Sequence, residues 1–328
     1  MSIKALIRRD LRKERIAELE AQRVRGEITP QDFQKQVSGL EPKSVWYLNP
    51  AKPFVKPAWF LPNNATALPA TPYQVTLAAG GTSGVIPVEF DEGTGHGEIF
   101  ALVSEHTGAY EVTITDQGRK YQLMDRPIHA DTICGSAAQP FILPLTYFVS
   151  VREGTRQLSL NFTDLSGAPN DIRFAMLGRR WLHREAPADV LETFHQRFAQ
   201  LDRSLLYFTT TKDPLAAVAP GGAGTEFQVI APSDAPLELM KLTAVTDPAG
   251  TPFEIELNEY GSGRSFSGDR LRVHSNLMFG TPNFPSIPFE SFFLPRNFRL
   301  IGRIYNLGLG AADFYLTWTG AKILRPDQ

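Results

Sequence analysis

The chain has 328 residues, 42% of them hydrophobic, with a formal net charge of −2 and one cysteine. The apolar content excludes a disordered chain, and the near-neutral charge argues against a general nucleic-acid binder. The single Cys134 excludes an internal disulfide framework and a cysteine-based zinc site. The sequence contains no run of about 18 apolar residues that would predict a membrane span, and its charged beginning lacks a secretion pattern. We therefore expect synthesis in a reducing cytoplasm.

Residues 1–40 are rich in helix-forming residues and predict a helical hairpin. Thr29 can cap the second helix, with Pro30 in its first turn. A basic run that includes Arg8 and Arg12 is interleaved with carboxylates. This mixture favours a solvated helix, or one bound to a partner protein, over a helix bound to nucleic acid. We assign Arg8 and Arg12 as interaction residues.

Residues 41–72 alternate prolines with large apolar residues, which predicts an extended arm, because proline also restricts the residue before it. Each large apolar side chain left in water forgoes roughly 1.5–3 kcal/mol of burial energy. We therefore expect the arm to lie on a protein surface, of its own chain or of a neighbour. The interaction residues assigned in the arm are Trp46, Tyr47, Phe54, Trp59 and Phe60.

Residues 73–185 and 204–328 carry short segments of alternating apolar and polar residues, separated by Gly and Asn/Asp turns. This pattern is typical of antiparallel β-sandwiches and jelly rolls. Between them, residues 186–203 carry apolar residues at helical spacing and predict an interdomain helix. The sequence thus predicts a mainly β chain with two tandem antiparallel β-sandwich or jelly-roll-like domains.

The two predicted domains are copies of one unit, because matching residues keep their order and nearly their spacing. The matches are 128–135 with 273–280, 158–165 with 300–307, Asp171 with Asp313, and Gly178 with Gly320.

His129 and His274 occupy equivalent positions in the two copies. Neither has another histidine, cysteine or carboxylate at ligand spacing, so we interpret the pair as a position of the fold that accepts imidazole. The sequence contains no phosphate-binding loop, dinucleotide fingerprint or nucleophile elbow. We predict no catalytic residue, no cofactor and no metal site.

Two rival hypotheses rest on other residues. A glycosidase needs paired carboxylates, and the acidic candidates of the first copy show no such pairing; they are Asp91, Glu92, Glu98 and Glu105. The second copy is rich in phenylalanines that favour a core or subunit interface, with a glycan platform as the alternative; they are Phe284, Phe289, Phe292, Phe293 and Phe298.

Each copy ends in the same succession of features. A strand with a Leu-Pro or Ile-Pro pair is followed by a strand closing on Asp-Leu or Asn-Leu. A short turn and an apolar strand closing on glycine and a basic residue come next. The segments are 141–144, 162–165 and 172–180, and then 287–289, 304–307 and 314–322. In this succession the chain resembles the β-sandwich modules of tailed-bacteriophage virion proteins, over the repeats and not over the first 70 residues.

The resemblance implies a non-enzymatic structural component of a phage virion, made in the host cytoplasm. We expect a capsid decoration or minor head protein, anchored by its N-terminal arm. Its partners would be the major capsid protein or other virion proteins, and it would be a homo-oligomer without a membrane. The alternatives are a neck or tail component, a glycan- or receptor-binding spike, and a β-sandwich hydrolase.

Overall fold

The computed structural model describes residues 55–64, 73–90, 96–118, 121–136, 138–149, 157–181, 203–262, 272–279 and 292–323, together with Gln22 and Ser265. The predicted helical hairpin lies outside these residues, apart from Gln22. The predicted interdomain helix also lies outside them, apart from Arg203, where a strand begins. In the described part of the chain, no helix is long and apolar enough to cross a membrane. The chain divides into two compact units, 1–55 with 185–200, and 56–184 with 201–328. Every sheet described below belongs to the second unit, apart from Val55 at the start of β1.

The first sandwich is built from two antiparallel sheets. One has the order β1-β10-β4-β8, with β2 also paired to β10; the other has the order β3-β9-β5-β6, with β7 also paired to β5. The elements are β1 (Val55–Phe60), β2 (Gln74–Leu77), β3 (Ile86–Glu89), β4 (His96–His106), β5 (Tyr110–Asp116), β6 (Tyr121–Gln122), β7 (Ile128–His129), the 3-10 helix η2 (Ala130–Thr132), β8 (Phe141–Val149), β9 (Gln157–Asp164) and β10 (Asn170–Trp181).

The second sandwich has the same plan. Its sheets have the orders β11-β19-β14-β17, with β12 also paired to β19, and β13-β18-β15-β16. The elements are β11 (Arg203–Thr209), β12 (Leu215–Val218), β13 (Thr225–Ile230), β14 (Leu237–Asp247), β15 (Phe253–Glu259), β16 (Val273–His274), the helix α4 (Ser275–Met278), β17 (Phe292–Leu294), β18 (Arg299–Asn306) and β19 (Ala312–Ile323).

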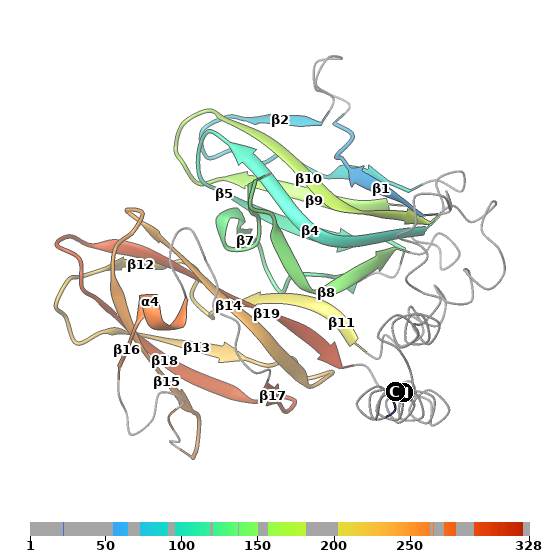
Figure 1. Cartoon of the computed structure of the whole chain (residues 1–328). Helices are drawn as coiled ribbons and strands as arrows, with labels where there is room; N and C mark the ends of the chain where they lie inside the picture. The colour runs from blue at the N-terminus through green and yellow to red at the C-terminus, as the bar shows by residue number, and fades with distance from the viewer. Residues whose placement is uncertain are drawn as a thin grey trace. The chain divides into compact units, whose positions relative to one another are not determined.

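The internal repeat is confirmed by the strand orders and pairings of the two sandwiches, most of whose strands are labelled in Figure 1. β2, β3, β4 and β5 of the first sandwich correspond to β12, β13, β14 and β15 of the second. β7, η2 and β8 correspond to β16, α4 and β17, and β9 and β10 correspond to β18 and β19. The prediction of a mainly β chain with two antiparallel sandwiches is therefore confirmed.

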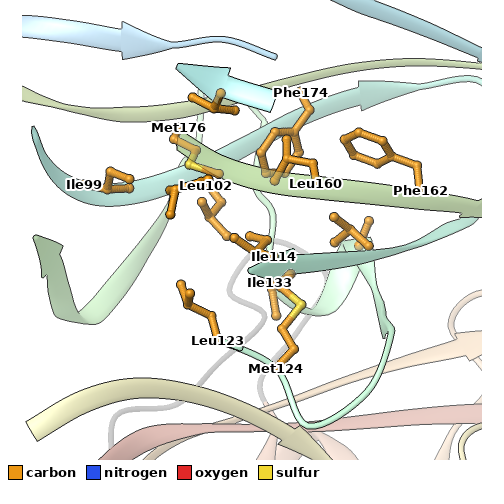
Figure 2. Packing of buried hydrophobic residues seen from close by; sticks show 14 of the residues in the cluster. Ile99, Leu102, Ile114, Leu123, Met124, Ile133, Leu160, Phe162, Phe174 and Met176 are labelled. Atoms are coloured by element: carbon orange, nitrogen blue, oxygen red, sulfur yellow. The ribbon is translucent and has the colours of Figure 1, made fainter. Parts of the chain in front are cut away.

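Alternation along the strands builds each core. On β5, Tyr110, Val112 and Ile114 are buried, while the residues between them are half-buried. This is the period expected when one face of a strand points into a sandwich. Figure 2 shows Ile114 with Phe162 and Phe174 of β9 and β10 in the first core, where the two phenylalanine rings are 5.7 Å apart.

Gly178 and Gly320, matched in the sequence, occupy the same tight place in the two sandwiches. A Cβ atom on either would lie 2.2 Å from a backbone oxygen of the neighbouring strand, that of Glu98 or Glu238. Since backbone atoms cannot move aside cheaply, each site accepts only glycine without a shift of the sheet. The repeat thus preserves a packing requirement.

Part of the predicted arm 41–72 lies within the described residues. Its residues 55–60 form β1, which pairs with β10 in the first sandwich. Phe60 is buried in that core, with its ring 4.9 Å from the ring of Phe90. Pro57 fits because, among the described strands, β1 pairs with β10 alone, and proline is tolerated on edge strands.

Candidate functional site at the junction of the two sandwiches

The strand β11 belongs to both cores. Leu206 and Phe208 are buried in the second core, whereas Leu205 and Tyr207 are buried in the first. Successive side chains of a strand point to opposite faces, so one strand can serve two cores if a sandwich covers each face. The two sandwiches are therefore joined through a shared structural element.

The first sandwich also pairs with the backbone of β11. The Tyr207 N–H donates to the Leu123 carbonyl at 2.8 Å, and the Asp125 N–H donates to the Tyr207 carbonyl at 3.1 Å. The Tyr121 hydroxyl donates to the Leu205 carbonyl at 3.0 Å. These bonds satisfy the edge of β11 that faces away from β19.

The η2 turn of the first sandwich contacts β14 and β19 of the second. The Thr132 hydroxyl donates to the His129 carbonyl at 2.7 Å and lies 2.8 Å from the Thr317 hydroxyl. Since a hydroxyl carries one proton, Thr317 is the donor in the second bond. The Thr243 hydroxyl donates to the Thr132 carbonyl at 2.8 Å. All three threonines are buried, so these bonds satisfy groups that would otherwise be costly to remove from water.

The two equivalent histidines hold short helices. Nδ1 of His129 accepts from the Asp131 N–H at 3.3 Å, and Nδ1 of His274 accepts from the Asn276 N–H at 3.2 Å. Burial lowers the pKa of His129, which favours the neutral ring that this acceptor role requires. The His129 ring also packs on Tyr315, with centroids 4.4 Å apart. The interpretation of this pair as a fold position is confirmed.

Two carboxyl groups lie at the junction, Asp125 from the first sandwich and Asp213 from the β11–β12 connection. Burial raises the pKa of Asp125 to about 6 and that of Asp213 to about 7. The negative charges of Glu111 and Asp125 act on Asp213 in the same direction. Arg126 lies beside them, with Nε 3.5 Å from Asp125 Oδ2 and Nη1 donating to the Thr211 carbonyl at 3.3 Å. The junction therefore holds a carboxyl group that is partly protonated near neutral pH.

No group of three or more His, Cys, Asp or Glu side chains among the described residues is placed to hold a metal ion. Strongly shifted carboxyl groups occur both in active sites and in buried structural clusters. The geometry of the junction holds the two sandwiches together.

The predicted interaction residues fall in different places. Trp59 is 65% exposed on β1, whereas Phe60 is buried and contributes to the core of its own chain. The other interaction residues assigned from the sequence lie outside the described residues; they are Arg8, Arg12, Trp46, Tyr47 and Phe54.

The acidic and aromatic candidates are not brought together in the described structure. Glu98 is buried, and Glu105 forms an ion pair of 2.9 Å with Arg173. Phe293 is 57% exposed, while Phe298 packs against the second core. Asp91, Glu92, Phe284 and Phe289, and the side chain of Phe292, lie outside the described residues.

The residues that build the junction were not found from the sequence. Thr132 lies within a matched segment of the repeat, where the other copy has Leu277, and this change of polarity was the available signal. Asp125 and Asp213 are separated by 88 positions and carry no spacing that would connect them.

No protein-family model matches this sequence, and no curated protein matches it. Among solved structures, the chain is similar to a protein in the atomic structure of Sulfolobus Turreted Icosahedral Virus, with 10% identity, a TM-score of 0.42, and 82% of this chain and 91% of that chain covered. It is similar to peptide-N(4)-(N-acetyl-β-D-glucosaminyl) asparagine amidase, with 9% identity, a TM-score of 0.36, and 83% and 97% covered. It is also similar to VP2 of the infectious bursal disease virus subviral particle, with 9% identity, a TM-score of 0.22, and 83% and 42% covered.

Proposed function

We propose that this protein is a non-enzymatic structural component of a virion of the tailed-bacteriophage kind, a capsid decoration or minor head protein. The observation that carries the proposal is that the residues matched between the two copies do structural work in both. A duplicated scaffold would keep such residues, whereas a duplicated catalytic domain would keep a cluster of reactive groups in at least one copy.

Asp164 and Asn306 illustrate this argument. The Asp164 carboxylate accepts from the Gly80 N–H at 2.8 Å and from the Ser166 N–H at 3.2 Å. The Asn306 side chain donates to the Val218 carbonyl at 2.7 Å and accepts from the Gly308 N–H at 2.7 Å. Each side chain ties the turn after its own strand to the loop after β2 or the end of β12.

The junction supports the same function. A strand shared by two cores and a buried threonine cluster make separate movement of the sandwiches costly, since both cores would be opened. A protein that bears load on a particle benefits from such a joint, while binding modules joined by a flexible linker do not need one.

The exposed apolar residues at β1 support attachment to a partner. Trp59 is 65% exposed and Leu61 is 42% exposed. In the sequence both belong to the arm of prolines and large apolar residues. Neighbouring exposed apolar side chains mark protein contacts. We assign the partner as the major capsid protein or another virion protein, and the location as the virion.

A truncation tests the proposal. Since Phe60 belongs to the first core, the truncation removes residues 1–54 and retains β1. The variant should remain folded, as judged by circular dichroism. Its occupancy in purified particles imaged by electron microscopy should fall below that of the full chain, because only Trp59 and Leu61 of the attachment surface remain. Incorporation at the occupancy of the full chain would contradict anchoring by the N-terminal segment, and absence of the full chain from particles would contradict the virion role.

A second candidate is a hydrolase at the junction, favoured by the raised pKa values of Asp125 and Asp213. Paired carboxyl groups with unlike protonation states can act as general acid and base. Hydrolysis of glycosidic or amide substrates by the full chain, abolished in the Asp125→Asn and Asp213→Asn variants, would favour this function. No turnover of any substrate in a panel of this kind would contradict the hydrolase function and favour the structural role.

A further inference from the structure

The contact made by η2 has a counterpart in the repeat, whose turn and sheet face do not meet each other in the described part of the chain. In the first sandwich, η2 packs on the outer face of β14 and β19 of the second sandwich. The equivalent of η2 is α4, and the equivalents of β14 and β19 are β4 and β10. The molecule therefore carries a second turn and a second sheet face of the same kinds.

The register locates the receiving position on the first sandwich. Because Asp171 matches Asp313, Ala175 matches Thr317. Ala175 pairs with Val103 across β10 and β4, as Thr317 pairs with Thr243 across β19 and β14. Val103 and Ala175 thus stand where the two threonines that receive η2 stand in the other sandwich.

An open groove of about 300 Å³ lies at this position on the first sandwich. Val103 and Ala175 line it, together with Leu61, Tyr73 and Arg173. Val103 and Ala175 give the groove an apolar part, while Ser104 and the ion pair of Arg173 with Glu105 add polar groups to its lining. The apolar part is therefore a receiving surface for an apolar side chain.

The α4 turn presents such a side chain. Leu277, which matches Thr132, is 74% exposed, whereas Thr132 is 1% exposed beneath its contact. The cap formed by His274 repeats the cap formed by His129, so the two turns are held in the same way.

The η2 contact is polar on both the turn and the sheet, whereas the equivalent residues of α4 and of β4 and β10 are apolar on both. In the existing contact, the hydroxyl of Thr132 meets a threonine hydroxyl. In the counterpart, Leu277 replaces Thr132, and Val103 and Ala175 replace the two threonines. Apolar side chains gain favourable free energy when they are buried against each other, as the threonines do when they form hydrogen bonds. The substitutions on the turn and on the sheet are therefore complementary.

We propose that the groove on β4 and β10 receives the α4 turn of a second copy of this chain, with Leu277 seated against Val103 and Ala175. The turn and the groove are different surfaces, so the contact is heterologous, and repeated association closes into a ring or extends as a filament. This inference goes beyond the proposed function and does not depend on it.

Disulfide trapping between separately purified variants tests the contact. Leu277→Cys protein is mixed with Ala175→Cys protein under mild oxidation, and products are resolved on non-reducing gels. We expect a covalent dimer that requires both variants. The matched control is Leu309→Cys, since Leu309 is fully exposed in the β18–β19 loop. Equal yield with the control would overturn the proposal, and an equal product from the Leu277→Cys protein alone would overturn the head-to-tail arrangement. Cys134 is present in every sample, so any disulfide that it forms appears in the control as well.

Light scattering gives an independent measurement on the intact chain. The average mass of the wild type should rise with concentration, and Leu277→Asp should hold it near that of the monomer. Leu309→Asp should behave as the wild type. Circular dichroism confirms that each variant is folded. A wild type that stays monomeric at every concentration, or equal effects of the two aspartates, would overturn the proposal whatever the fate of the virion hypothesis.

Discussion

Replacement of Asp213 by asparagine should stabilise the protein at pH 8 and have little effect at pH 4. Burial raises the pKa of Asp213 from 3.8 to about 7, with the charges of Glu111 and Asp125 acting in the same direction. The folded state therefore binds this proton more tightly than the unfolded state. The resulting stability is fully present below pH ~4 and is lost as the pH rises through ~7.

The size of the effect follows from the shift. One pKa unit corresponds to about 1.4 kcal/mol, so ionising Asp213 in the folded state costs at most about 4 kcal/mol. Local rearrangement around a group that retains some solvent contact reduces this ceiling, and we expect a gain of about 1–3 kcal/mol for Asp213→Asn at pH 8.

Urea denaturation at pH 4 and pH 8, followed by tryptophan fluorescence, to which the buried Trp318 of the second core contributes, measures the effect. The quantity of interest is the difference in unfolding free energy between variant and wild type at each pH. The exposed Glu89 provides the control substitution Glu89→Gln. A difference of the same size at both pH values, or a loss of stability at pH 8, would refute the reasoning.

Three further predictions concern other parts of the fold. Hydrogen bonds from neighbouring turns outweigh the effect of burial and hold the pKa of Asp164 at about 2, so its stabilisation is lost as the pH falls from ~4 to ~2; Asp164→Asn should flatten this acid limb in a circular dichroism titration. Gly178→Ala and Gly320→Ala should each lower the free energy of unfolding by about 1–3 kcal/mol, measured with denaturant. Gly310→Ala, with open space around it, should change this free energy by less than about 0.5 kcal/mol. Similar losses at all three sites would contradict the packing argument. Leu205→Ala should cost about 2–5 kcal/mol and leave a single transition seen alike by fluorescence and circular dichroism, because β11 serves both cores; separate transitions would show that the sandwiches unfold independently.

Much of the fold could be predicted because it depends on patterns of residues close together in the sequence. Alternation along strands such as β5 depends on the two-residue period of extended backbone, and it identified the sandwich class. Glycines at tight positions, and a histidine before a short helix, were recognisable because both copies required them. The composition of the arm predicted that its aromatic residues contact protein, but it could not tell whether they contact their own chain or a partner. Phe60, assigned as an interaction residue, is buried in the core of its own chain. An aromatic in a proline-rich segment fits a strand of its own sheet as well as the surface of a partner.

The sequence by itself determined the class of fold, its duplication and the positions that duplication had to preserve. The class of fold follows from residues close together in the chain, and the other two follow from comparing its two halves. The tertiary structure decided which edge of β11 received the first sandwich and how the buried threonines Thr132, Thr243 and Thr317 met. It also decided that Asp125 and Asp213 share one junction. These features depend on pairing between segments far apart in the sequence, and on the burial that such pairing creates. No local pattern encodes either of them.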